Sequence, residues 1–154
     1  MPSLTLHIGT EKTGTTSIQE YLRINKSLLL ERNIFVPEYL GFSNHIMLPL
    51  AFYGSDQNDE LSDGHSLTDP RDRADKRREI IELLSCSANK YPRHHFIISS
   101  EHLQSRLTQA NLIKDLKNAL SEIFSRINIL LYIRKPLDTA LSSWSTEVKS
   151  GKDV

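Results

Sequence analysis

The sequence predicts an α/β fold, in which helices cover both faces of a central parallel sheet to make three α/β/α layers. Short β-prone apolar runs at residues 4–8, 96–98 and 127–133 have the length of strands. The stretches between them repeat apolar residues at helical spacing, and loop-like or polar residues follow each run. With 154 residues, the chain has room for one domain with a sizeable core, spanning residues 1–154.

Composition argues against several function classes. Basic and acidic residues balance at 19 each, so we do not expect a general nucleic-acid binder. The single cysteine, Cys86, excludes an internal disulfide and fits a reducing compartment, so we expect a cytoplasmic protein. We see no signal peptide before the first predicted strand and no run near the roughly 20 apolar residues of a membrane span. The sequence has no zinc-type spacing.

The first predicted strand, residues 4–8, leads into a glycine loop. Gly9 and Gly14 have the separation of the Walker A pattern G-x-x-x-x-G-K-[ST], but Thr15 replaces its lysine and Lys12 lies inside the loop. A strand, a tight loop and a helix start together present backbone N–H groups and partial positive charge to one point, which suits phosphate. Hydroxyls that either cap the helix or donate to phosphate come from Thr15, Thr16 and Ser17. The alternative interpretation is a glycine turn before a core helix.

The segments that follow alternate between helix and strand. Residues 15–32 predict one helix, interrupted at Asn25, with an inward stripe of Ile18, Tyr21, Leu22, Leu28 and Leu29. Residues 34–36 predict a short strand that ends at Pro37. Residues 43–53 predict a short helix, in which Pro49 marks a kink or a break.

Residues 54–72 are rich in turn-forming residues and have little to bury. They form either a flexible loop over the site or a solvated insertion, and the sequence does not decide between the two. The helix that follows is expected to turn Ile80, Ile81, Leu83 and Leu84 inward. Its bases could dock an anion, but interleaved acids nearly cancel them and favour an exposed face of Arg71, Arg73, Lys76, Arg77 and Arg78.

A titratable pair follows the strand at residues 96–98. Ligands collect outside the carboxyl ends of strands in open parallel sheets, and the residues at this end are Ser99, Ser100, Glu101 and His102. Glu101 or His102 could act as a base and remove a proton from a hydroxyl group of a substrate, the acceptor. The structural alternative, which is compatible with the first, is that Ser100 caps a helix and Glu101 supports its first turn.

The last third of the chain repeats the helix–strand–helix pattern. Residues 108–125 predict an amphipathic helix, with inward side chains Leu112, Ile113, Leu116, Leu120, Ile123 and Phe124. Residues 127–133 predict the strongest strand, which ends at Arg134. Pro136 begins a helix that ends near Gly151, with an inward stripe of Leu137, Ala140, Leu141, Trp144 and Val148.

Two histidines have both a structural and a functional interpretation. His7 could be a ligand or a base, but its place before the loop favours a core or edge histidine with a local hydrogen bond. His45 could face an acceptor pocket, and a surface or cap position is favoured over that role.

The order K-T-G-T-T, from Lys12 to Thr16, resembles the 5′-phosphosulfate loop of sulfotransferases that use 3′-phosphoadenosine 5′-phosphosulfate (PAPS). A second feature of that family is a strand that ends in arginine, followed by a serine eight residues on, and Arg134 and Ser142 occupy the matching positions. The chain therefore resembles the amino-terminal part of a bacterial or carbohydrate-type family member. Members usually continue into further helices and a late loop over the adenosine, so we expect the fold to be P-loop NTPase-like and incomplete at the carboxyl end.

The resemblance implies transfer of a sulfuryl group from PAPS to a hydroxyl or amine of a glycan, lipid or small molecule, with 3′-phosphoadenosine 5′-phosphate (PAP) as the product. It places the 5′-phosphate at Thr10, Lys12, Thr13, Gly14, Thr15, Thr16 and Ser17. Arg134 and Ser142 would hold the 3′-phosphate, with Ser143 the rival if the register slips by one. Lys12 would neutralise charge on the leaving group, and Glu101, with His102 second, would be the base. The mechanism that the resemblance implies requires no metal.

Two other classes stay open at this point. The first is a P-loop kinase or other phosphotransferase, which shares the strand–loop–helix start but needs Mg²⁺. Against it, Thr15 replaces the Walker lysine, and Arg134 follows the last strand in place of a metal-holding acid. The second is a truncated domain that binds nucleotide or a partner without catalysis, for which an exposed apolar patch would be the sign.

Overall fold

In the computed structural model, which describes residues 1–10, 12–149 and 151, four parallel strands form one sheet in the order β2-β3-β1-β4. The strands are β1 (Ser3–His7), β2 (Ile34–Phe35), β3 (His95–Ser99) and β4 (Arg126–Leu130). β1 pairs with both β3 and β4, so the strand that leads into the glycine loop lies inside the sheet. The predicted α/β fold with a parallel central sheet is confirmed.

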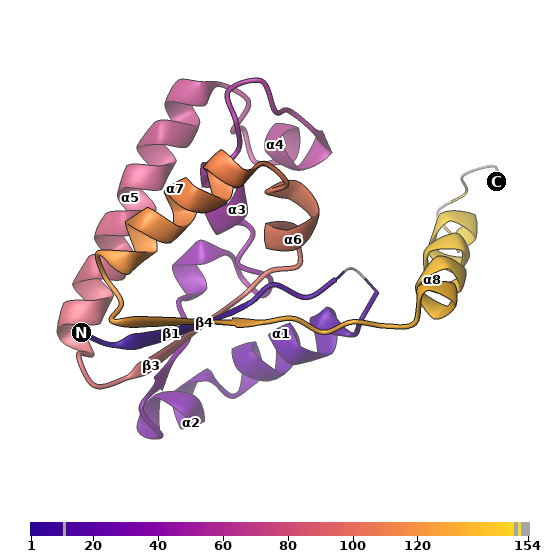
Figure 1. Ribbon diagram of the computed structural model, residues 1–154. Coiled ribbons are helices and arrows are strands. Elements are labelled where there is room, and N and C mark those ends of the chain that lie inside the picture. Colours follow the sequence, from indigo (N-terminus) through magenta and orange to yellow (C-terminus); the bar gives the residue numbers. More distant parts are fainter. Residues whose placement is uncertain (11, 150, 152–154) are drawn as a thin grey trace.

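Helices lie on both sides of this sheet (Figure 1). α1 (Thr15–Ile24) and α2 (Lys26–Glu31) cover one face, and α3 (Met47–Ala51), α5 (Pro70–Lys90), α6 (His102–Arg106) and α7 (Ala110–Ser121) cover the other. A 3-10 turn, η1 (Glu38–Leu40), precedes α3, and α4 (Glu60–Gly64) lies beyond it. α8 (Pro136–Lys149) stands apart from both layers. No helix among the described residues is long and apolar enough to cross a membrane.

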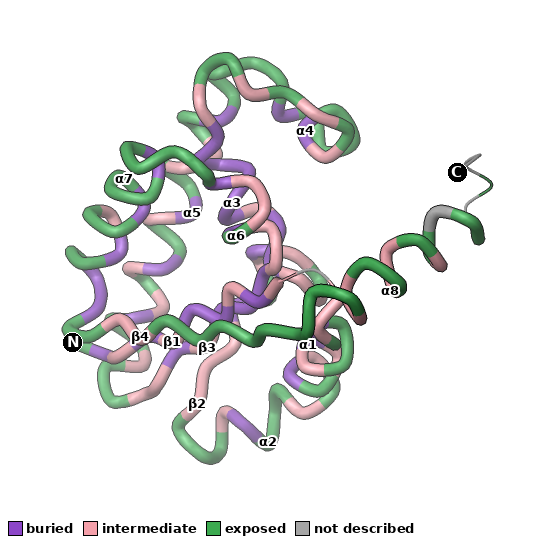
Figure 2. Tube along the Cα trace, turned by 45° about the vertical axis from the view of Figure 1, so that its right-hand side comes forward, coloured by how far each residue is buried: buried purple, intermediate pink, exposed green. Residues whose placement is uncertain are grey.

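The main core lies between the sheet and the α5–α7 layer. Leu4 and Leu6 of β1 and Phe96 and Ile98 of β3 are buried there, in one cluster with side chains of α3, α5 and α7. The opposite face of β1 is more polar, because Ser3 and Thr5 both hydrogen bond to the ring of His95 on β3. Figure 2 shows buried residues concentrated in this part of the molecule and mainly exposed residues along α8.

The predicted helix over residues 15–32 is two helices. The break is at Asn25, whose side-chain N–H group donates to the carbonyl oxygen of Tyr21 at 2.9 Å. Asparagine offers the backbone such local hydrogen bonds as an alternative to the helix ladder. Tyr21 and Leu28 are exposed, so their predicted inward position is wrong. α1 instead buries Thr15, Gln19 and Leu22, and α2 buries Leu29.

The helix predicted over residues 43–53 is shorter, because α3 spans only Met47–Ala51. Pro49 lies in the first turn of this helix, where a proline is tolerated. Residues 54–72, for which the sequence predicts no regular structure, contain α4. Its start has a capping box, in which Asp59 and Ser62 bond to each other's backbone N–H groups. The turn-rich composition of the segment hides this short helix.

Arg73 is buried, so its predicted place on an exposed basic face is wrong. Its guanidinium donates to the carbonyl oxygens of Ser55 and Gln57 and to the side-chain oxygen of Asn58. A buried guanidinium requires such partners, and their position 15 to 18 residues earlier in the chain could not be predicted from charge alternation. α5 therefore anchors the segment before α4.

The carboxyl-terminal elements show the other differences. α7 is shorter than predicted, and Ile113 is 51% exposed although its position in the helical pattern predicts burial. β4 is an edge strand, and Ile129, Leu130 and the three residues after it are exposed. The apolar stripe of α8 is also exposed, so its predicted inward orientation is wrong, because α8 packs on neither helical layer.

Candidate functional site

The glycine loop joins β1 to α1, and two of its residues adopt the left-handed backbone conformation. Lys12 and Gly14 have φ values of 65° and 85°, and Gly14 is the residue that caps α1. A Cβ atom on Gly9 would lie 2.5 Å from the Thr15 methyl group, so the loop passes directly over the first residue of the helix. The Thr13 hydroxyl donates to the carbonyl oxygen of Thr10 at 2.6 Å and closes the loop on itself.

Among the described residues, no side chain caps the start of α1, so the interpretation in which the hydroxyls of Thr15, Thr16 or Ser17 cap this end is wrong. Thr16 and Ser17 are exposed, whereas Thr15 is buried beneath Gly9. The first N–H groups of a ten-residue helix and two exposed hydroxyls therefore lie at one end of the loop, an arrangement that suits an anion.

The two predicted nucleotide-binding segments run side by side. Ile8 donates through its backbone N–H group to Leu130, and both the N–H group and the hydroxyl of Thr10 donate to the carbonyl oxygen of Tyr132. One guanidinium N–H group of Arg134 donates to the carbonyl oxygen of Lys12 at 3.1 Å. Residues 122 positions apart in sequence thus meet at the carboxyl edge of the sheet.

α8 approaches this edge through its polar side. The Lys12 ammonium group donates to the hydroxyl of Thr146 at 2.9 Å, and that hydroxyl donates to the backbone carbonyl of Ser142. Ser142 and Ser143 are both half-buried on α8, so the geometry does not distinguish the predicted serine from its rival. Sequence reasoning missed Thr146, whose only signal was its position one helical turn after Ser142.

Glu101 and His102 lie at the carboxyl end of β3, as the strand pattern predicts. The Glu101 carboxylate accepts a 2.6 Å hydrogen bond from the Gln19 amide, and His102 Nε2 lies 4.0 Å from the other carboxylate oxygen. Gln19 is buried on α1, one helical turn after Thr15, so it connects the candidate base to the glycine-loop helix. Ser100 does not cap α6: within the part of the chain that the structure describes, no side chain caps that helix, and the buried Ser100 hydroxyl has no hydrogen-bond partner.

Two buried histidines hold the end of β3 just before Glu101. His7 is buried, which confirms the prediction of a core histidine, but its hydrogen bond is not local: Nδ1 is 2.7 Å from the hydroxyl of Ser99 on β3. His45 Nδ1 accepts a 2.8 Å hydrogen bond from the Ser99 N–H group, so a surface or cap position for His45 is wrong. Both contacts join residues far apart in sequence, which is why helix and strand patterns do not reveal them.

Burial favours the neutral form of both histidine rings. It lowers the pKa of His7, although the Glu101 carboxylate acts in the opposite direction. It lowers the pKa of His45 to about 4, because the cost of burying charge exceeds the opposing effect of the Glu38 carboxylate. A neutral His45 ring retains the lone pair on Nδ1 that accepts the Ser99 N–H group.

Within the described residues, no group of three His, Cys, Asp or Glu side chains has the arrangement to hold a metal ion. Comparisons with protein-family models, with characterised proteins and with solved structures find no match to this chain. What the structure establishes is therefore the class: an α/β protein with a four-stranded parallel sheet, in which a glycine loop, an arginine and a carboxylate lie at one edge.

Proposed function

We propose that this chain binds PAPS and transfers its sulfuryl group to an acceptor hydroxyl or amine. The observation that carries the proposal is the contact between Arg134 and the backbone of Lys12, because it brings the two candidate phosphate-binding segments to one edge of the sheet. A nucleotide with phosphate groups at both the 5′ and 3′ positions needs two such segments, whereas ADP or ATP needs only the first.

The residues suit the two phosphate groups. Backbone N–H groups at the start of α1, with Thr16 and Ser17, are donors for the 5′-phosphate. Arg134 has five N–H donors, of which one is used on Lys12, so its planar fork can still grip a phosphate. Ser142, on α8, would donate to the 3′-phosphate as well. The ligand would replace the Thr146 hydroxyl as the hydrogen-bond partner of Lys12.

The proposed transfer is an in-line displacement. The acceptor oxygen forms a bond to sulfur while the bond between sulfur and the bridging oxygen breaks, and PAP leaves with that oxygen. Lys12 offsets the negative charge that develops on the leaving phosphate. Glu101 takes the proton from the acceptor, with its carboxylate oriented by Gln19, and His102 is the second candidate for this role.

Calorimetric titration with PAP tests the nucleotide part of the proposal directly. We expect PAP to bind in the presence of EDTA and to bind more tightly than ADP with Mg²⁺. Arg134→Ala should weaken PAP binding by roughly tenfold to a hundredfold and leave ADP nearly unchanged, since a hydrogen bond to a charged group contributes about 1.5–3 kcal/mol. Arg93→Ala is the matched control, because Arg93 is an exposed arginine just before β3, at the opposite end of that strand from Glu101.

Tighter binding of ADP with Mg²⁺ would replace the proposal with a kinase-type function. If PAP binds but no sulfate reaches any of a panel of glycan, lipid and phenol acceptors, the chain is a nucleotide-binding domain without transfer activity. Equal loss of PAP and ADP binding in Arg134→Ala would show that Arg134 shapes the glycine loop and does not read the 3′-phosphate.

A further inference from the structure

The apolar stripe of α8 faces away from the rest of the molecule. Leu137, Leu141, Trp144 and Val148 recur at helical spacing, and each is between 51% and 71% exposed. Thr146, whose hydroxyl accepts the Lys12 hydrogen bond, lies on the opposite side of the helix. The polar side of α8 is therefore turned toward the glycine loop, and its apolar side has no contact surface within the described chain.

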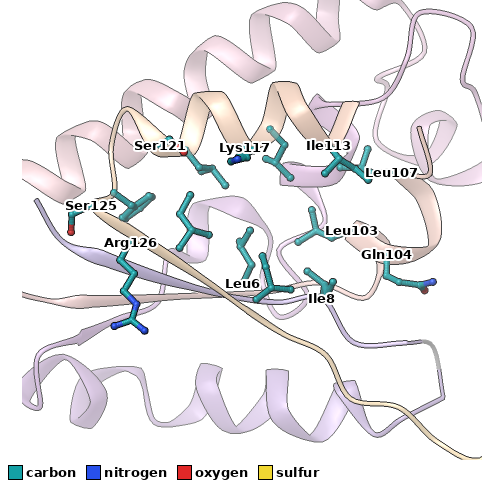
Figure 3. A pocket seen from close by; sticks show the side chains of 15 residues that line it. Leu6, Ile8, Leu103, Gln104, Leu107, Ile113, Lys117, Ser121, Ser125 and Arg126 are labelled. Atoms are coloured by element: carbon teal, nitrogen blue, oxygen red, sulfur yellow. The ribbon is translucent and has the colours of Figure 1, made fainter. Parts of the chain in front are cut away.

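An open apolar groove lies between α7 and the sheet, and it is the second exposed apolar surface of the molecule. This groove has a volume of about 630 Å³ and is lined on the sheet side by residues such as Leu6, Ile8 and Ile129 and on the helix side by residues such as Ile113 and Leu116. Figure 3 shows these two walls facing each other with open space between them. Ile113 and Ile129, one from each wall, are 51% and 59% exposed. Contiguous exposed apolar surface of this kind marks an interaction site.

The two surfaces match in kind. α8 has 14 residues and is about 21 Å long, and the α7 wall runs for nine residues, Ile113 to Ser121, or about 13 Å. The groove carries Lys117 and Arg126 among its polar lining residues, and the first turn of α8 carries Asp138, which can pair with them, while Lys149 lies at the far end of the helix. An amphipathic helix with a central tryptophan is a common occupant of such a groove.

The position of α8 excludes its own groove as the contact surface. Two hydrogen bonds hold α8 at the glycine loop. Arg134, just before α8, donates to the carbonyl oxygen of Lys12, and the Lys12 ammonium group donates to Thr146 on the polar side of α8. Figure 1 shows α8 well separated from α7 in this arrangement. The bond between Lys12 and Thr146 would have to break for α8 to fold back onto its own α7, whereas a second molecule can use the exposed stripe with that bond intact.

We propose that two copies of this chain form a symmetric dimer in which α8 of each copy occupies the α7–β4 groove of the other. The contact is reciprocal, so one two-fold axis fills both grooves and covers both stripes, and the assembly closes at two copies. This inference depends on the two apolar surfaces and not on nucleotide binding or transfer.

Trp144 is the only tryptophan in the sequence, and it reports directly on the proposed contact. Sedimentation and intrinsic fluorescence should be measured together, across dilution from about 100 to 1 μM. We expect a dimer at high concentration with blue-shifted emission, and a shift toward the emission of exposed tryptophan as the dimer dissociates.

Two charge substitutions test the two surfaces separately and keep the fluorophore. Leu141→Glu changes the stripe and Ile113→Glu changes the groove, and both positions are exposed in the single chain, so the fold should be retained. Each variant alone should be monomeric. Mixed in equal amounts they should form a heterodimer, because the groove of the first and the α8 of the second are both intact. Thr139→Glu, on the opposite side of α8, is the matched control and should dimerise like the unaltered protein.

Three outcomes would overturn the proposal. A monomer with the emission of exposed tryptophan at every concentration means that nothing covers α8. A monomer with blue-shifted emission means that α8 packs on its own chain. A dimer that survives Leu141→Glu or Ile113→Glu uses another surface, for which the unpaired outer edge of β4 is the first candidate.

Discussion

Lys12 is the single residue on which the proposed chemistry depends most directly. Its ammonium group lies at the glycine loop and bonds only a neutral hydroxyl, Thr146, among the described contacts. Lys12→Ala should reduce sulfate transfer by about 10²- to 10³-fold, the cost of removing one group that stabilises charge in a transition state. The measurement is transfer of radiolabelled sulfate from PAPS to an acceptor identified in the panel.

Thr146→Val is the control for Lys12, because it removes the resting partner and keeps the ammonium group. It should retain most of the activity. Near-normal transfer by Lys12→Ala, with the fold verified by circular dichroism, would remove Lys12 from the mechanism.

Glu101 and Gln19 are the candidate base and the residue that orients its carboxylate. Glu101→Gln should lower kcat by at least about 10²-fold with PAP affinity unchanged, as expected for loss of a general base. Gln19→Leu should lower kcat less, and the double variant should be no worse than Glu101→Gln, because a positioning residue has no effect once the group it orients is gone. Gln109→Leu, at an exposed position, is the control. Additive losses would contradict the positioning role.

His45 makes the stability of the protein depend on pH. Its pKa is about 4 in the folded chain and about 6.5 when unfolded, so the unfolded state binds the proton first as pH falls. The stabilising effect of the neutral ring is complete above pH 6.5 and is lost between pH 6.5 and 4. The loss is on the order of 3 kcal/mol in the free energy of unfolding. Burial lowers the pKa of His7 and His95 as well, which adds to the same trend.

Urea unfolding at several pH values between 7 and 4.5 measures this dependence. His45→Asn should unfold more easily at pH 7 but show a shallower decline toward pH 4.5. His65→Asn should retain the full decline, because His65 is exposed. Identical slopes for the original protein and His45→Asn would contradict the assignment.

At the scale of elements, the glycine loop depends on close packing over the start of α1. In Gly9→Ala the new methyl group would lie 2.5 Å from the Thr15 methyl group, so the loop or the helix must shift. We expect a loss of about 1–3 kcal/mol in the free energy of unfolding, the usual range for overpacking. Thr15→Ser removes the opposing methyl group and should recover part of that loss in the double variant.

Gly64→Ala is the matched control for Gly9→Ala. Gly64 is the last residue of α4, and a Cβ atom there would meet nothing within 4 Å. This change should be neutral or stabilising by up to about 1 kcal/mol. Failure of Thr15→Ser to relieve Gly9→Ala, measured by urea unfolding, would show that a different contact limits the loop.

At the scale of the whole molecule, Arg73 joins α5 to the segment that precedes α4. Arg73→Ala removes hydrogen bonds to two backbone carbonyls and one side-chain oxygen. It should cost about 3 kcal/mol or more in the free energy of unfolding, because the carbonyl groups lose a charged partner. Hydrogen exchange should also become faster at Gln57 and Asn58. Arg71→Ala, an exposed arginine in the same helix turn, should change stability by no more than about 0.5 kcal/mol.

The sequence by itself determined which segments of the chain form strands and where along the chain the candidate site residues occur. Strand runs such as residues 4–8 and 96–98 are recognisable because apolar, β-branched and aromatic residues cluster over a strand's length. The glycine loop is recognisable because its geometry is encoded within six residues, Gly9 to Gly14. Glu101 could be placed at the site because the ends of parallel strands share one edge of a sheet. All of these are short-range signals.

Only the tertiary structure decided which distant groups meet. The contacts of Gln19 with Glu101 and of His45 with Ser99 join residues 82 and 54 positions apart, and no local pattern specifies such pairs. The same reason explains α8. Its periodicity shows that one side is apolar, but whether that side is buried depends on where the chain places the helix. Amphipathicity is a property of a segment, whereas burial is a property of the partner against which the segment packs.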